Sequence, residues 1–277
     1  MNACPRLLLS ACIALLPVSP LLAQSAADPG TMSHGSMQGG SAPADARDPH
    51  AYSGGQDFGP LGRPRLADEH NFGALVVERL EAQRAEDETA AAYEVIGWYG
   101  RDYDRAVLKA EGHREQGRLQ EARTELLWSH AVAAYWDAQL GARYDSGAEP
   151  GRGWLAVGVQ GLAPYWFHVD ATAYAGANGR TALRVAAEYE SLLTQRWVLA
   201  PRLEANAYGK EDAERGEGRG LSDMTAGLRL RYEIRREFAP YLGIERTLMV
   251  GATAELARAA GQPPGVTRAV AGIRFWF

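Results

Sequence analysis

The closing segment, residues 266–277, alternates strictly between two kinds of side chain. One face carries Arg268 and Arg274, and the other consists of Ala269, Ala271, Ile273, Phe275 and Phe277. Because successive side chains of a β-strand point to opposite faces, this segment predicts a strand with one apolar and one charged face. A final strand that ends in Phe is typical of bacterial outer-membrane barrels. The segment therefore predicts compartment, fold and topology together.

Hydropathy agrees with this interpretation. A membrane protein built from helices needs runs of roughly 18 or more apolar residues, and the sequence has none after its N-terminus. Membrane barrels place apolar residues at alternate positions, so their average hydropathy is unremarkable. The mean hydropathy of −0.29 fits this pattern but does not by itself separate a barrel from a soluble β-protein.

Residues 1–23 have the features of a secretory signal. Arg6 precedes an apolar stretch, and the small residue Ala23 offers a cleavage point before Gln24. Both cysteines, Cys4 and Cys12, lie inside this segment, so cleavage after Ala23 leaves a mature chain without disulfides. Residues 9–12 also match a lipoprotein cleavage box, which would acylate Cys12. The apolar run before Cys12 is short, and ordinary cleavage is favoured.

Residues 24–70 lack apolar periodicity and are rich in Gly, Ser, Ala, Asp and Pro. Such a segment buries too little apolar surface to offset the entropy of ordering. We predict a disordered N-terminal periplasmic arm here, followed by an outer-membrane β-barrel over residues 71–277.

Alternating segments follow one another from residue 72 to the end, and we predict about twelve antiparallel strands. The predicted strands are 72–86, 88–100, 105–116, 118–132, 136–145, 152–162, 166–177, 181–192, 196–208, 219–234, 238–248 and 264–277. An even number in this range is typical of bacterial barrels. Alternation does not say which face is inside, but small apolar faces in a secreted chain favour lipid contact around a charged lumen. Because twelve strands exceed the roughly eight that side chains just fill, some lumen is expected.

The predicted connections alternate in length. The short ones are 101–104, 133–135, 163–165, 193–195 and 235–238, and the long ones are 145–153, 209–220 and 257–265. Short periplasmic turns and longer outer loops place both termini in the periplasm. Aromatic residues gather at the short-turn end and predict an interfacial girdle. They are Tyr135, Trp136, Tyr165, Trp166 and Tyr241.

The arm contains Met32, His34 and Met37 within seven residues, and His50 further along. Thioether and imidazole groups suit Cu(I), and imidazole also binds Cu(II) well. A Gly/Ser linker with chance methionines remains the alternative.

Two further clusters are expected in the lumen. His113 shares a face with Glu111 and Glu115, and His168 shares one with Asp170. Most lumenal charges should instead pair with one another, because buried charges need partners. The charged set comprises Arg123, Glu125, Arg143, Arg184, Glu188, Glu190, Arg202, Glu204, Arg229, Arg231 and Glu245.

No catalytic signature is convincing, and we expect no enzyme. The Gly-rich stretch 216–220 lacks the following helix that a phosphate loop needs. Ser129 and His130 are neighbours in a strand and so should face opposite sides.

The chain from about residue 48 onwards resembles the copper resistance protein B family of outer-membrane proteins. The resemblance lies in residues 48–70, 161–176, 220–245 and 271–277. It implies a barrel that acts in copper tolerance beside a periplasmic multicopper oxidase, with a Met/His-rich arm. The arm of this chain is sparser than the family's repeated Met-His clusters.

We therefore predict an outer-membrane protein that binds copper and exports or sequesters it. The candidate ligands are Met32, His34, Met37, His50, Glu111, His113, His168 and Asp170. Outer-membrane lipid and the oxidase are the expected partners, and no nucleic acid is expected. A general porin without metal specificity and a barrel hydrolase remain open as alternatives.

Overall fold

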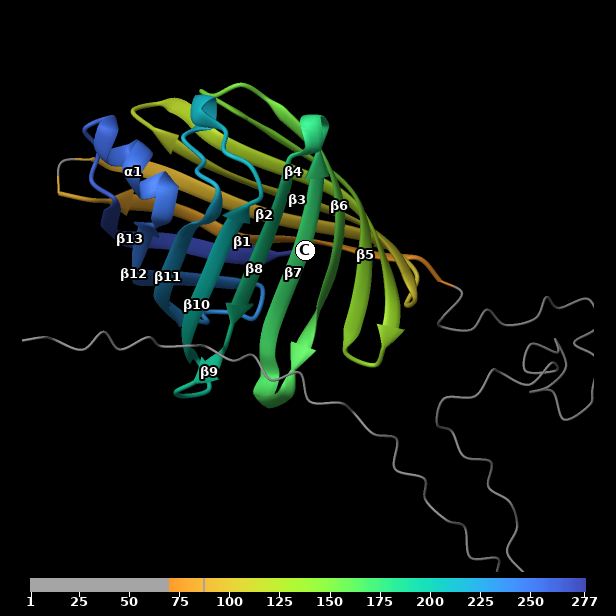
Figure 1. The fold of residues 1–277 in the computed structure, drawn as a ribbon. Coiled ribbons are helices and arrows are strands. Elements are labelled where there is room, and N and C mark those ends of the chain that lie inside the picture. The colour runs from red at the N-terminus through yellow and green to blue at the C-terminus, as the bar shows by residue number, and fades with distance from the viewer. Residues whose placement is uncertain (1–69, 87) are drawn as a thin grey trace, which may run out of the picture. The chain divides into compact units, whose positions relative to one another are not determined.

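Twelve long antiparallel strands close into a barrel in the computed structural model, which describes residues 70–86 and 88–277 (Figure 1). Together with one strand of two residues, β9 (Ser191–Leu192), the twelve long strands are β1 (Phe72–Arg84), β2 (Thr89–Gly100), β3 (Asp104–Glu115), β4 (Arg118–Ala133), β5 (Trp136–Gly147), β6 (Arg152–Ala163), β7 (Phe167–Gly176), β8 (Thr181–Glu188), β10 (Trp197–Tyr208), β11 (Gly220–Tyr232), β12 (Phe238–Met249) and β13 (Gly265–Trp276). Three short 3-10 turns, η2 (Pro164–Trp166), η3 (Ala177–Gly179) and η4 (Ala213–Arg215), and one helix, α1 (Gly251–Ala259), lie between strands. The strand prediction is confirmed to within a few residues at each boundary.

The first and last strands close the barrel. β1 pairs with β13, and Phe277 N donates to Leu75 O at 2.9 Å just beyond the last strand. The short β9 continues β8, because both pair with β10 and Tyr189 N between them still donates to Pro201 O. Each of the twelve long strands is therefore paired on both sides, which is what a membrane-spanning sheet requires. We call the end that holds Phe72 and Trp276 the terminal end, and the opposite end the α1 end.

The polar face of each strand points into the barrel. Glu125 is 2% exposed, whereas its neighbour Leu126 is 62% exposed. The same inversion recurs around the barrel, with buried Arg143, Arg229 and Glu245 and exposed leucines on the outward face. An exposed apolar band around a charged interior is the arrangement of a barrel that sits in lipid. Within the described residues, no helix is long and apolar enough to cross a membrane.

Connection lengths differ less than the sequence suggested. Two connections at the α1 end are long, 209–219 and 250–264, but the others there are as short as those at the terminal end. The predicted long loop 145–153 shrinks to 148–151 because β5 continues to Gly147. A two-residue turn joins β3 to β4 through Gln116 and Gly117, both with positive φ (47° and 81°). Positive φ at both central residues gives a turn whose twist matches the strands.

Helix α1 was not predicted. It occupies part of the connection between β12 and β13, and its sequence GATAELARA contains good helix formers. Its buried face is formed by Thr253, Ala254 and Ala257, and Ala257 lies four and three residues after the other two, the spacing that places side chains on one side of a helix. Thr253 Oγ1 accepts a hydrogen bond from Gly218 N at 2.9 Å and lies 2.8 Å from Ser222 Oγ. The helix therefore fastens both long connections at this end.

The aromatic girdle predicted at the terminal end is confirmed for three of its five residues. Tyr135, Tyr165 and Trp166 are exposed on the outside, and the Tyr135 and Trp166 rings meet edge to face at 6.4 Å. The assignment of Tyr241 to the girdle was wrong. Its side chain faces inward, is 5% exposed, and donates to Glu81 Oε2 at 2.9 Å. Position near a turn did not reveal the face on which the ring lies.

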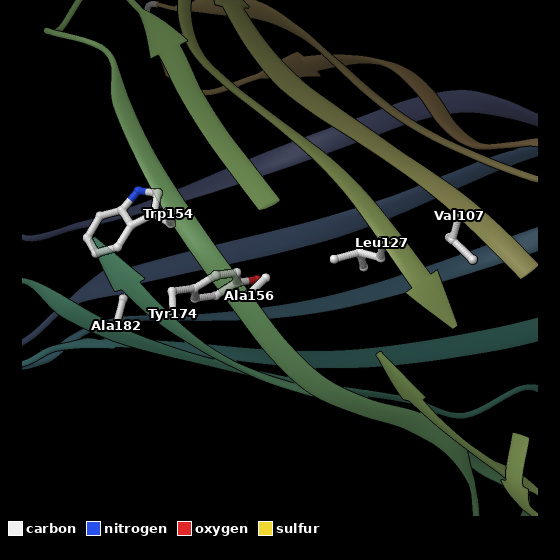
Figure 2. Close-up of a cluster of buried hydrophobic side chains, with 6 residues drawn as sticks. All are labelled: Val107, Leu127, Trp154, Ala156, Tyr174 and Ala182. Carbon is white, nitrogen blue, oxygen red and sulfur yellow. The ribbon is translucent and has the colours of Figure 1, made fainter. Parts of the chain in front are cut away.

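The barrel interior also holds a small apolar cluster (Figure 2). Its members are Val107, Leu127, Trp154, Ala156, Tyr174 and Ala182. Trp154, Ala156, Tyr174 and Ala182 gather at one side of the view, and Leu127 and Val107 lie farther along (Figure 2). The lumen is thus partly filled by packed side chains.

Candidate functional site: the barrel interior

A continuous chain of ion pairs runs through the middle of the lumen. It contains no metal ligand of the thiol or imidazole type, and each carboxylate in it contacts at least one arginine. In order, its members are Glu81, Arg229, Glu245, Arg79, Glu94, Arg202, Glu204, Arg184, Glu111 and Arg123. Charges taken out of water are stable only with close partners. The ion-pair chain gives such partners to the buried charges of eight strands.

Several pairs bridge strands that are not neighbours. Arg202 on β10 lies 3.1 Å from Glu94 on β2, and Arg184 on β8 lies 3.0 Å from Glu111 on β3. Lys109 on β3 reaches Asp170 on β7 at 2.5 Å. Since these strands stand apart in the sheet order, the bonds cross the lumen. The predicted pairing of lumenal charges is confirmed, and its cross-barrel partners are new.

Nearer the α1 end, Arg143 is held between aromatic rings and a carboxylate. Its guanidinium donates twice to Asp145, at 2.7 and 3.0 Å, and lies 4.5 Å from the Tyr174 ring centroid and 5.7 Å from that of Trp154. Trp154 Nε1 also donates to Asp145, at 2.8 Å. This unit fixes polar and aromatic groups together and blocks part of the cross-section.

A cavity of about 420 Å³ opens between the ion-pair chain and the terminal end. At the terminal end of the barrel the cavity is lined by Tyr135, Leu162 and His168. Its inner part is lined by Glu111, Arg123 and Arg184. We call this cavity the vestibule. Its lining has eight carboxylates against six Lys or Arg side chains, which gives a net negative charge when His168 is neutral. Such a cavity attracts cations.

The structure brings three of the four predicted lumenal ligands into the vestibule. Glu111, His168 and Asp170 line it, while His113 lies outside it and contacts Glu115 at 2.9 Å. Glu111 is held by Arg123 and Arg184, and Asp170 by Lys109 and Thr172. Among residues 70–86 and 88–277, no group of three His, Cys, Asp or Glu is placed to hold a metal ion. Met32, His34, Met37 and His50 lie outside the described residues.

Sequence reasoning missed the residues on the first two strands. Arg79, Glu81 and Glu94 join the two halves of the ion-pair chain. The signal was present in β1, where Arg79, Glu81 and Gln83 occupy alternate positions with Leu80 and Ala82 between them. Alternation could have placed them on the inner face, but not against Arg202 or Arg229.

At the α1 end, Asp212 ties the long connection 209–219 to the barrel wall. Its carboxylate accepts from Arg152 Nε at 2.9 Å and lies 3.1 Å from Arg180. Hydrogen bonds from Arg152, together with the charges of Arg152 and Arg180, hold the pKa of Asp212 below its usual value. In the same connection, burial raises the pKa of Glu217. We call the contact of Asp212 with Arg152 and Arg180 the loop latch.

Ser129 and His130 face opposite sides, as alternation predicts. Ser129 Oγ is buried and donates to Asp137 at 3.2 Å, whereas His130 contacts Asp104 at 2.9 Å on the outer rim of the terminal end. The two side chains therefore cannot act together on one substrate.

Comparisons with known proteins agree with this architecture. A family model described as Copper resistance protein B precursor (CopB) matches residues 71–277. Copper resistance protein B of Escherichia coli is 43% identical over 203 residues, 73% of this chain and 69% of that protein. A copper resistance protein B homolog of Pseudomonas syringae pv. tomato is 40% identical over 279 residues, 99% of this chain and 95% of that protein. Among solved structures, the NanC porin shares the fold, with a TM-score of 0.50 at 11% identity over 73% of this chain and 98% of that one. The chain belongs to the copper resistance protein B family.

Proposed function

We propose that this protein serves copper resistance by binding periplasmic copper at the outer membrane, with capture on the arm and a weaker site in the vestibule. The termini then lie on the periplasmic side and the α1 end faces outward. The observation that carries the proposal is the vestibule itself, a net-negative cavity at the terminal end whose lining includes His168, Asp170 and Glu111, although these three do not form a ready-made metal site.

The chemistry of the ligands distinguishes tight capture on the arm from weaker binding in the vestibule. Met32, His34, Met37 and His50 offer thioether and imidazole groups, which favour Cu(I) and also accept Cu(II). In the vestibule, Glu111 and Asp170 already accept bonds from cations, so copper would have to displace Arg123, Arg184 or Lys109. Binding there is therefore weaker and exchangeable, which suits a transfer site.

The cross-lumen pairs favour sequestration over free diffusion. A passing ion would meet the bridges Arg202–Glu94 and Arg184–Glu111 between the vestibule and the α1 end. Export would require these pairs to rearrange. A periplasmic multicopper oxidase acting on the captured copper is the partner that fits this scheme.

The test is copper bound per chain by the refolded mature protein, measured with Cu(I), Cu(II) and zinc. Deleting residues 31–37 should lower the copper stoichiometry while leaving the barrel folded. Deletion of residues 38–44, which has the same length but removes no Met or His, is the matched control. Unchanged stoichiometry after the first deletion would refute the arm's role.

The vestibule is tested separately with the double variant His168→Ala/Asp170→Asn. We expect it to keep the arm's copper and lose only the weaker, exchangeable fraction. A protein that binds zinc as well as copper, or neither, would contradict copper selectivity and favour a general porin instead.

A further inference from the structure

Three exposed arginines stand on the outward, apolar face of the barrel near the α1 end. They are Arg84 on β1, Arg114 on β3 and Arg246 on β12. Each alternates with inward residues: Arg84 follows buried Gln83, Arg114 follows His113, and Arg246 follows buried Glu245. They therefore belong to the surface that contacts lipid, not to the charged lumen.

Strand register places these arginines at one height. Arg84 opposes Ala269 on β13, which opposes Ile244, and Arg246 lies two residues beyond Ile244 towards the α1 end. On the other side, Arg84 opposes Thr89 on β2, while Arg114 opposes Ala91, two residues nearer the terminal end. From Arg246 to Arg84 and from Arg84 to Arg114, each arginine therefore lies two residues nearer the terminal end than the ladder partner of the one before it. Each of these steps crosses two strands.

Strand tilt compensates this shift. From Phe238, at the terminal end of β12, ladder partners lead through Phe275, Val77, Val95, Ala110 and Thr124 to Tyr144, near the α1 end of β5. A ladder line therefore climbs towards the α1 end as strand number increases, as tilted strands require. A row of residues that moves one residue towards the terminal end at each strand cancels this climb and stays at a constant height along the barrel axis. Successive arginines are two strands, about 10 Å, apart around the wall.

Among the described residues, these arginines are not held in ion pairs as the lumenal ones are, although the connection after Arg84 contains Glu86 and Glu88. In the part of the chain that the structure describes, no carboxylate lies within ion-pair distance of Arg84, Arg114 or Arg246. Arg246 donates to Thr267 Oγ1, at 3.0 Å, and Arg114 donates to Gly117 O, at 2.8 Å. On the terminal side of the row the wall is apolar, with Leu80 and Ile244 exposed, and Leu248 is exposed on the α1 side of Arg246.

We propose that these three arginines form a level docking row for the phosphate groups of an anionic glycolipid in the outer leaflet. Guanidinium groups bind phosphate through paired hydrogen bonds, and an arginine on a lipid-facing wall is tolerated near the interface but not at mid-membrane. The apolar side chains below the row fit acyl chains. The row requires the α1 end to face outward, but it does not depend on copper.

The experiment compares the wild type with the triple variant Arg84→Gln/Arg114→Gln/Arg246→Gln. Full-length protein is purified from outer membranes in mild detergent, and the phosphorylated glycolipid that stays bound is measured by native mass spectrometry. Loss of charge-assisted bonds should reduce retention roughly tenfold or more. The matched control, Arg101→Gln/Arg235→Gln/Arg236→Gln, removes three arginines from turns at the terminal end and should retain the lipid.

Thermal unfolding with added ligands identifies the source of the phosphate. Phosphorylated lipid A should raise the unfolding temperature of the wild type and of the control, but not of the triple variant. Dephosphorylated lipid A and inorganic phosphate should have no such effect. Equal retention in the triple variant, equal loss in the control, or stabilisation by inorganic phosphate or by phosphatidylglycerol vesicles alone would overturn the docking row.

Discussion

Arg202 and Glu94 lie on strands that do not pair, yet Arg202 Nη1 is 3.1 Å from Glu94 Oε2. Glu94 also contacts Arg79, so one carboxylate joins β10, β2 and β1 across the lumen. This contact makes the interior ion pairs part of the structural framework of the barrel, because it connects opposite walls that the backbone ladder does not connect.

The variant Glu94→Gln should destabilise the barrel. It leaves Arg79 and Arg202 without a shared counter-charge in a mostly buried site, which costs about 3–5 kcal/mol in comparable cases. The free energy of unfolding, measured by urea titration in detergent or vesicles, checks this. Glu149→Gln, in an exposed connection at the α1 end, should leave that free energy unchanged. Equal free energies of unfolding for the two variants would show that the cross-lumen pair does not stabilise the barrel.

The double variant Arg202→Ala/Glu94→Ala should increase ion conductance. Removing both side chains opens the lumen at the level where the ion-pair chain crosses it, and single-channel recording in planar bilayers measures the change. We expect little current through the wild type. A wild-type current typical of an open porin would contradict the view that these bridges close the lumen.

The variant Tyr174→Phe tests the aromatic part of the interior. Tyr174 OH donates to Glu125 Oε1 at 2.7 Å, and Glu125 is 2% exposed. Losing this donor should lower the free energy of unfolding by about 1–3 kcal/mol, because a buried acceptor loses its partner. Tyr144→Phe removes a hydroxyl from a ring that is 57% exposed on the outside and serves as the control.

The variant Asp212→Asn should release the connection 209–219. Because the pKa of Asp212 is lowered in the folded protein, the latch stabilises the loop above the ordinary aspartate pKa of roughly 4 and fades only as pH falls through the lowered value. The wild-type loop should therefore resist proteolysis at neutral pH and become susceptible only in strong acid. The variant should be cut at neutral pH, while Glu211→Gln, also in this connection, should behave like the wild type. Protection of Asp212→Asn at neutral pH would contradict the latch.

The sequence was sufficient for the strands because their signal is local. Alternation over each segment, such as Leu126 against Glu125, depends only on the two-residue period of a strand and survives in any β environment. The same local rule separated Ser129 from His130. It failed for α1, where a short Ala-rich helix lies inside a connection, and for Tyr241, whose position near a turn suggested the wrong face.

The amino-acid sequence by itself determined the number of strands, the two faces of each and the apolar surface that needs lipid. The tertiary structure decided which charges meet, because Arg202 and Glu94, or Lys109 and Asp170, come together only when the sheet closes and opposite walls stand one lumen apart. It also decided that Arg84, Arg114 and Arg246 share one height, since strand tilt and register are properties of the closed barrel and of no single strand.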